Sequence, residues 1–113
     1  MSTPKELYNE AEKLKDDGKH DEAIEKLKEV LEQDESHVLS HLALAVVLGK
    51  VGEHEQAVKH GQRACELDPE DPFNFTAMSV TFQRAFAGTQ NHSYIQLAED
   101  AMARAHMLQG HAH

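Results

Sequence analysis

Residues 38–50 read Val-Leu-Ser-His-Leu-Ala-Leu-Ala-Val-Val-Leu-Gly-Lys, and this stretch decides how the rest of the chain is arranged. Apolar residues occupy nearly every position instead of a single stripe, which is typical of a helix that is covered on most sides. The segments before and after it are amphipathic, with one polar face each. The sequence therefore predicts a buried central helix with packed neighbours on either side.

Length and composition limit the class of protein. A chain of 113 residues can build one modest core but not two ordinary ones, so we expect a single domain over residues 1–113. The first residues lack the apolar core of a secretion signal, and no run approaches the roughly 20 apolar residues of a membrane helix. The single cysteine, Cys65, cannot form an internal disulfide and is interpreted as a small buried thiol. These features predict a soluble, cytoplasmic protein.

The charge of the chain argues against two classes of partner. A formal net charge of -9 disfavours nucleic acid, because such binding depends on Lys and Arg neutralising phosphates, and it disfavours anionic membranes for the same reason. The charge is also uneven, since residues 4–37 carry six basic and twelve acidic residues, residues 38–71 three and six, and residues 72–113 two and two. The first third of the chain is therefore expected to be well solvated, and the last third to be poorly solvated.

The chain repeats itself at a shift of 34 residues. The segment Gly-Lys-His-Asp-Glu-Ala-Ile that begins at Gly18 reappears from Gly52 as Gly-Glu-His-Glu-Gln-Ala-Val. Apolar residues recur at spacings of three and four, and glycine is the usual residue just past a helix end. Each unit is therefore predicted to be a helix, a tight turn and a second helix. The predicted helices span residues 4–17, 20–33, 37–50, 54–67, 72–87 and 94–108.

Three predicted helix starts carry capping residues. Residues 3–6, Thr-Pro-Lys-Glu, combine a capping hydroxyl, a proline at the first helical position and a glutamate that can reach back. Asp71 before Pro72 repeats this arrangement at the fifth helix. Ser93 and Gln96 have the spacing of a further capping box, which we expect to open the sixth helix.

On these residues the chain resembles the tetratricopeptide repeat family, whose unit is a pair of helices of about 34 residues. The bulky slots of the first helix match Leu7, His41 and Phe75, then Leu14, Leu48 and Phe82, and the small slot of the second helix matches Ala23 and Ala57. The resemblance implies an all-α fold of about six antiparallel helices, with repeats at residues 4–37, 38–71 and 72–110. It predicts buried side chains at Ala23, Ala57, Leu14, Leu27, Leu44 and Leu48.

The third repeat departs from the family pattern. Ala98, Met102 and Ala105 keep the spacing of the second helix but arrive seven residues late. Residues 86–93 are therefore expected to form a longer loop or to lengthen the fifth helix.

Nine histidines raise the question of a metal site, because neutral imidazole is a common ligand of Zn, Cu and Ni. The weak candidate ligands are His92, His106, His111 and His113, but no Cys or acidic residue accompanies them. His41 falls in a core slot of the repeat and is interpreted as a packing residue. Nothing resembles a phosphate-binding loop or a nucleophile elbow. We expect no enzyme and no cofactor, and metal binding by the C-terminal histidines is the alternative function.

The leading hypothesis is a scaffold or adaptor that binds proteins. In the family that the chain resembles, partner peptides lie in a concave groove lined by the first helix of each pair. The resemblance implies that the groove residues here are Tyr8, Leu39, Leu42, Val46, Phe73, Thr76, Val80 and Arg84. The chaperone-binding members hold a terminal carboxylate with Lys, Asn and Arg, and those residues are absent from the matching slots. We therefore expect an apolar or amphipathic peptide segment as the ligand.

The sixth helix suggests self-association. Its charge is sparse, and only a short tail follows it, whereas solenoids normally end in a polar capping helix. Ile95 and Met107 are the residues predicted to form an exposed edge that supports a homo-oligomer.

Overall fold

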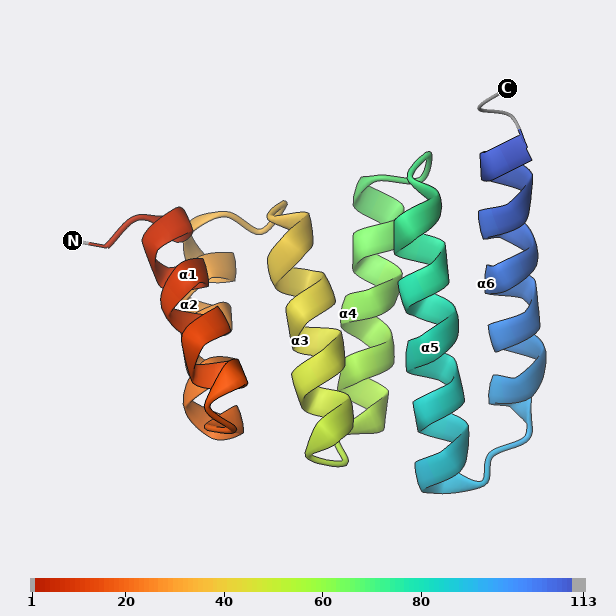
Figure 1. Cartoon of the computed structure of the whole chain (residues 1–113), viewed down its shortest axis with the longest axis horizontal. Helices are drawn as coiled ribbons and strands as arrows, with labels where there is room; N and C mark the ends of the chain where they lie inside the picture. The colour runs from red at the N-terminus through yellow and green to blue at the C-terminus, as the bar shows by residue number, and fades with distance from the viewer. Residues whose placement is uncertain (1, 111–113) are drawn as a thin grey trace.

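The computed structural model describes residues 2–110, and every regular element in this range is a helix (Figure 1). The helices are α1 (Pro4–Asp16), α2 (His20–Gln33), α3 (Val38–Lys50), α4 (His54–Leu67), α5 (Pro72–Thr89) and α6 (Ser93–Gly110). Each of them was predicted, with ends that differ from the predicted ends by at most two residues. None of these helices combines the length and the apolar character that a membrane span requires.

Three antiparallel hairpins stand side by side in chain order. α1 pairs with α2, α3 with α4, and α5 with α6, and most of the packing joins helices that are neighbours in sequence. In Figure 1, α1, α3 and α5 form the front layer, with α2 and α4 behind them. The stack measures 41 × 35 × 21 Å. α3 lies at its centre, because it packs against α2, α4 and α5.

Local capping explains where α1 and α5 begin. The Thr3 hydroxyl accepts a hydrogen bond from the Glu6 backbone N–H at 3.2 Å, and the Glu6 carboxylate accepts one from the Thr3 N–H at 3.3 Å. This is the predicted capping box. Asp71 likewise accepts a hydrogen bond from the Phe73 N–H at 2.9 Å. Each cap satisfies an N–H that has no partner within its helix.

The seven extra residues of the third repeat lengthen its helices and do not form a long loop. α5 continues to Thr89, and residues 90–92 alone connect it to α6. Gln90 ends α5 with a left-handed φ of 62°, close to the φ of 78° at Gly18 and 85° at Gly52 in the first two hairpins. Because glutamine has a Cβ, this conformation costs it about 1 kcal/mol that glycine avoids.

The capping box predicted at Ser93 is wrong. α6 begins at Ser93 itself, and the Asn91 side-chain oxygen accepts hydrogen bonds from the Ser93 N–H at 3.1 Å and from its hydroxyl at 2.8 Å. Gln96 does not reach back, since its amide donates to Asp100 at 2.8 Å. Asn91 takes the role because an asparagine side chain readily bonds the backbone two residues later.

The core is centred on α3, as the apolar stretch predicts. Its buried residues are Ser40, His41, Leu42, Ala43, Leu44, Ala45, Val47 and Leu48. Five of the six residues predicted to be buried are buried, namely Ala23, Ala57, Leu27, Leu44 and Leu48. Leu14 is the exception, because it is half-buried in an open hollow between α1 and α2, beside Lys13 and Lys26. No other helix of residues 2–110 lines that hollow, so part of Leu14 stays in water.

A polar network fastens the connection between α2 and α3 to α4. Nε2 of the buried His41 lies 2.8 Å from the Glu35 carbonyl oxygen, and its Nδ1 lies 3.0 Å from Nδ1 of His60. A carbonyl oxygen only accepts, so Nε2 of His41 carries a proton, and of the two facing Nδ1 atoms one donates and the other accepts. Arg63 completes the network with hydrogen bonds of 2.7 and 2.8 Å to the Glu35 carboxylate. His41 is thus a satisfied packing histidine, as predicted.

Cys65 is a buried thiol, as predicted. Its Sγ donates to the Asn74 carbonyl oxygen at 3.5 Å. Burial, together with the negative charge of Glu66, raises the pKa of Cys65 to about 11. The thiol therefore stays protonated and unreactive near neutral pH.

Candidate functional site

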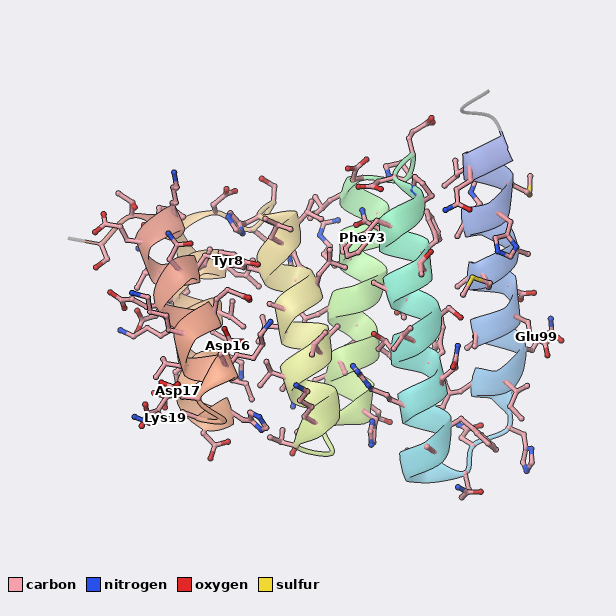
Figure 2. All side chains as sticks on the ribbon, in the orientation of Figure 1. Tyr8, Asp16, Asp17, Lys19, Phe73 and Glu99 are labelled. Carbon is pink, nitrogen blue, oxygen red and sulfur yellow. The ribbon has the colours of Figure 1, made fainter. Side chains whose placement is uncertain are left out.

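The face formed by α1, α3 and α5 carries exposed apolar side chains from α3 and α5. Leu39 and Phe73 expose 52 % and 62 % of their surface, and Val80 is exposed as well. Leu39 and Phe73 are 34 residues apart and so hold equivalent places in successive repeats. Figure 2 shows Tyr8 and Phe73 toward the same end of the molecule, near the starts of α1 and α5. We call Leu39, Phe73 and Val80 the apolar strip.

The other predicted groove residues are less available. Tyr8, Val46 and Thr76 are half-buried. The Thr76 hydroxyl donates to the Pro72 carbonyl oxygen at 3.2 Å, so its proton is already engaged. Leu42 is 9 % exposed and does not project into a groove as expected. The reason is the central place of α3, whose neighbours cover it on three sides.

Two cations lie at the other end of this face. The Arg84 stem rests on Gly49, because a Cβ at Gly49 would stand 3.8 Å from the Arg84 Cδ. Arg84 and the adjoining Lys50 are both exposed, and neither takes part in an ion pair within residues 2–110. Leu39 and Phe73 belong to the first turns of their helices, whereas Lys50 and Arg84 come late in the same helices. The face therefore runs from an apolar end to a basic end.

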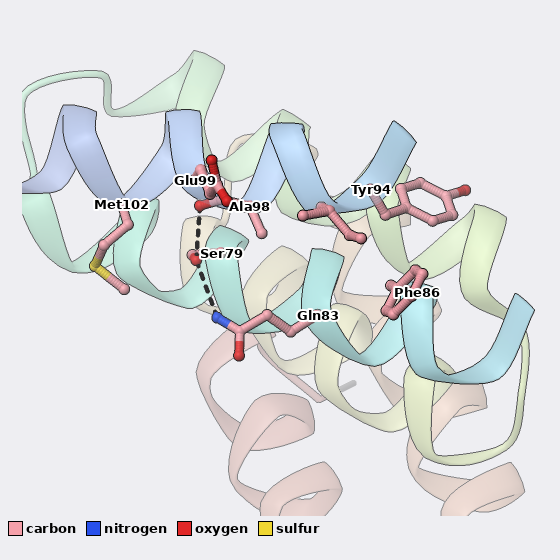
Figure 3. A pocket seen from close by; sticks show the side chains of 8 residues that line it. Ser79, Gln83, Phe86, Tyr94, Ala98, Glu99 and Met102 are labelled. Carbon is pink, nitrogen blue, oxygen red and sulfur yellow. Dashed lines mark hydrogen bonds between the residues drawn. The ribbon is translucent and has the colours of Figure 1, made fainter. Parts of the chain in front are cut away.

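A second surface feature, not predicted from the sequence, is an open groove between α5 and α6 (Figure 3). It has a volume of about 510 Å³ and is lined by Ser79, Gln83, Phe86, Tyr94, Ile95, Ala98, Glu99 and Met102. On its floor the Ser79 hydroxyl donates to the Ala98 carbonyl oxygen at 2.9 Å and accepts from the Gln83 amide at 3.2 Å. The floor is thus internally bonded, and the walls are mostly apolar. We call this feature the α5–α6 groove.

The two residues predicted to support self-association lie on different sides of α6. Ile95, which is 40 % exposed, lines the α5–α6 groove. Met107, which is 53 % exposed, follows twelve positions later, and the helical repeat turns it by roughly 120° from Ile95. Met107 instead shares a side with Leu97 and Arg104, which line a separate hollow over α5. Ile95 and Met107 therefore do not form one surface.

The predicted metal ligands fall only partly within the described residues. His92 packs against the Phe86 ring, with 5.4 Å between the ring centroids, and His106 is exposed on α6. His111 and His113 lie outside the described range. Among residues 2–110 no group of three or more His, Cys, Asp or Glu side chains is placed to hold a metal ion.

Solved structures of other proteins share this fold. The crystal structure of MamA superposes with a TM-score of 0.83 at 12 % sequence identity, covering 97 % of this chain and 60 % of MamA. A second MamA structure gives 0.71 at 13 % identity, covering 90 % and 56 %. PcrH, solved in complex with the chaperone binding region of PopD, gives 0.61 at 18 % identity, covering 96 % and 92 %. The chain thus spans about 60 % of the length of MamA.

At these identities the comparisons bear on the fold alone, which is a TPR-like helical repeat, as the sequence resemblance implied. No family model matches the sequence. No curated protein matches it either.

Proposed function

We propose that this protein is an interaction scaffold whose α1, α3 and α5 face binds an apolar or amphipathic segment of a partner protein. The observation that carries the proposal is the exposed apolar strip of Leu39, Phe73 and Val80. Removing apolar surface from water stabilises a complex by about 25 cal/mol per Å², and a grouped patch on one face is typical of an interaction site. PcrH, which holds a region of PopD, supports this use of a similar fold.

An amphipathic ligand suits this face better than a purely apolar one. The strip ends beside Arg84 and Lys50, two exposed cations in a protein whose net charge is -9. A carboxylate on the partner would pair with them there, while its apolar side chains cover Leu39 and Phe73. Complementary charge of this kind fixes the direction in which a segment binds and speeds its association.

Glutamate substitutions on the strip test the proposal. Leu39→Glu combined with Val80→Glu changes two exposed residues, whereas Leu42→Glu would place a charge in the core. Gln56→Glu combined with Gln62→Glu is the matched control, because it also adds two negative charges at exposed positions but on α4, outside the α1, α3 and α5 face. Partners captured by the wild type and the control, but not by the double variant, are then purified and titrated by calorimetry.

We expect the double variant to bind the purified partner at least tenfold more weakly, with an unchanged circular dichroism spectrum. Equal affinity of the double variant and the wild type would show that this face is not the binding surface.

Self-association is a second candidate function, favoured by the exposed apolar residues Leu97 and Met107 on the side of α6 away from the α5–α6 groove. Because Ile95 faces the α5–α6 groove, the contact between copies proposed here uses the Leu97 and Met107 side. Sedimentation velocity at tens of micromolar protein should show an oligomer that Met107→Glu shifts toward monomer. Gln109→Glu, at a nearby exposed position, should leave it intact. A wild type that sediments as a monomer throughout contradicts this candidate.

A further inference from the structure

The α5–α6 groove is the third in a series whose first two members are filled within the chain itself. The first lies between α1 and α2 and is filled by α3. There Ala11, Ile24 and Leu27 belong to one apolar cluster with Leu44 and Leu48. The last two residues are four apart on α3, so they project from the same side of that helix.

The second groove of the series lies between α3 and α4 and is filled by α5. Val58 shares an apolar cluster with Met78 and Phe82, which again are four residues apart, on α5. Met78 passes over Gly61, where an added Cβ would stand 2.8 Å from the Met78 Sδ and 3.9 Å from the Ala45 Cβ. Both filled grooves therefore hold a helix that presents two large apolar side chains one turn apart.

The repeat shift places the α5–α6 groove at the same position in the third repeat. Ser79 corresponds to Ala45, and, allowing for the seven extra residues, Met102 corresponds to Gly61. Phe86 and Ile95 add apolar walls. No helix of residues 2–110 fills this groove, although it lies at the same repeat position as the two grooves that are filled by α3 and α5.

One residue distinguishes the third groove from the other two. Glu99 lines it at the position held by Ile24 in the first repeat and Val58 in the second. Glu99 is exposed and takes part in no ion pair within the described residues. A helix bound here would bring one of its residues against this carboxylate, and a basic residue would complement it.

The same carboxylate argues against a second copy of the chain as the occupant. Stacking copies head to tail would insert α1, which has Glu10 and Leu14 where α3 has Leu44 and Leu48. A two-fold contact through the groove would bring two copies of Glu99 into one interface, because Glu99 lines the groove. Each arrangement gathers carboxylates in one interface, Glu10 with Glu99 in the first and two copies of Glu99 in the second, which opposes association.

We propose that the α5–α6 groove binds an amphipathic helix from a partner protein, with two large apolar side chains at positions i and i+4 and a basic residue that meets Glu99. This site is separate from the apolar strip on the α1, α3 and α5 face. It gives the scaffold a second binding surface with a different preference in charge.

α5 itself supplies a probe, because it already fills the second groove. Gly88 of α5 lies against the His54 ring of α4, and one turn further along each helix Ala85 and Val58 belong to the same apolar cluster. The residue at the place of Ala85 in a bound helix should therefore lie near Glu99. Two labelled peptides of residues 72–89 are compared, one with Ala85→Lys and one with Ala85→Glu. Both carry Phe73→Gln and Val80→Gln for solubility, and a covalent side-chain bridge on the face away from the groove keeps them helical.

We expect the lysine peptide to bind the full chain about tenfold more tightly than the glutamate peptide, measured by fluorescence anisotropy. Glu99→Lys in the chain should reverse the preference, and Met102→Glu should abolish binding of both peptides. Asp100→Lys is the matched control, since Asp100 is adjacent in sequence but lines the hollow on the other side of α6, and it should leave the preference unchanged. The Leu39→Glu, Val80→Glu variant should bind both peptides like the wild type, which separates this site from the apolar strip.

Three results would overturn the proposal. The first is equal affinity of the two peptides for the wild type, and the second is a preference for lysine that survives Glu99→Lys. The third is a homodimer that dissociates on Met102→Glu, because the occupant of the groove would then be the chain itself.

Discussion

Lowering the pH from 7 to 5 should destabilise the protein, because the unfolded chain takes up a proton at His60 that the folded chain largely does not. Burial, helped by the neighbouring positive charges of His41 and Lys28, lowers the pKa of His60 from 6.5 to about 4. The unfolded chain takes up this proton near pH 6.5, whereas the folded chain takes it up only near pH 4. Between these values the unfolded state binds more protons, so the free energy of unfolding falls as the pH falls.

The size of the effect follows from the same pKa. The difference between the pKa of His60 in the unfolded chain and in the folded chain corresponds to ~3 kcal/mol of stability. This loss of stability is complete only below pH 4. At pH 5 roughly half of it is reached, and the His60 ring is only partly buried, so solvent screening reduces it further. We therefore expect the free energy of unfolding to drop by ~1 kcal/mol between pH 7 and pH 5.

Urea denaturation followed by circular dichroism at pH 7, 6 and 5 measures this drop. His60→Asn is the informative variant, because its amide can donate to His41 near the place of Nδ1 but does not titrate. It should show a weaker pH dependence than the wild type. Glu35 contributes little between pH 7 and pH 5, since its pKa is 4.5 in the unfolded chain and its hydrogen bonds with Arg63 lower it to about 2 in the folded chain, so both values lie below this range. A wild-type free energy that is constant over this range, or an equal slope in His60→Asn, refutes the reasoning.

Three further outcomes follow from local contacts. Leu48→Ala removes a side chain that is 2 % exposed and should lower the free energy of unfolding by ~2 to 5 kcal/mol, and a change near zero would contradict the core described above. Thr3→Ala breaks the capping box with Glu6 and should cost ~1 kcal/mol in the same assay, whereas an unchanged midpoint would mean that the cap contributes nothing. Cys65 should resist thiol reagents at pH 7 and react at once in denaturing urea, and rapid labelling of the folded chain would show that the thiol is not protected.

Helix ends could be predicted because the groups that cap them are neighbours in sequence. Thr3 and Glu6 reach each other across a single turn, so their spacing alone indicates the capping box. The capping box predicted at Ser93 is wrong for a related reason, because two neighbouring residues compete to cap the same helix. Asn91 and Ser93 both offer an acceptor to the first turn of α6, and spacing does not say which one the backbone will use.

Burial was harder to predict, because it depends on what packs from the next repeat. Leu14 and Leu48 occupy the same repeat position, yet Leu48 is buried and Leu14 is half-buried beside polar neighbours. Leu39 and Leu42 were both expected to face solvent, and only Leu39 does so. A repeat pattern assigns equivalent positions, but it does not say how many neighbours each copy has.

The α5–α6 groove could not be predicted for a geometric reason. Seven extra residues could have entered the loop or the helices, and the register of α6 against α5 depends on that choice. The turn at residues 90–92 settles it and brings Glu99 beside Met102 at the groove. The repeat alignment already shows Glu99 at the position of Ile24 and Val58. That substitution indicates a charged groove only once the position of α6 against α5 is known.

The stacking of hairpins in chain order also governs how the molecule comes apart. Almost every contact between helices joins neighbours in sequence, so one end can open without breaking the packing at the other. Amide protons of α1 and α2 can then exchange with solvent through local openings that leave α5 and α6 closed. A helix held in the α5–α6 groove would slow exchange at its own end of the stack and leave the far hairpin as dynamic as before.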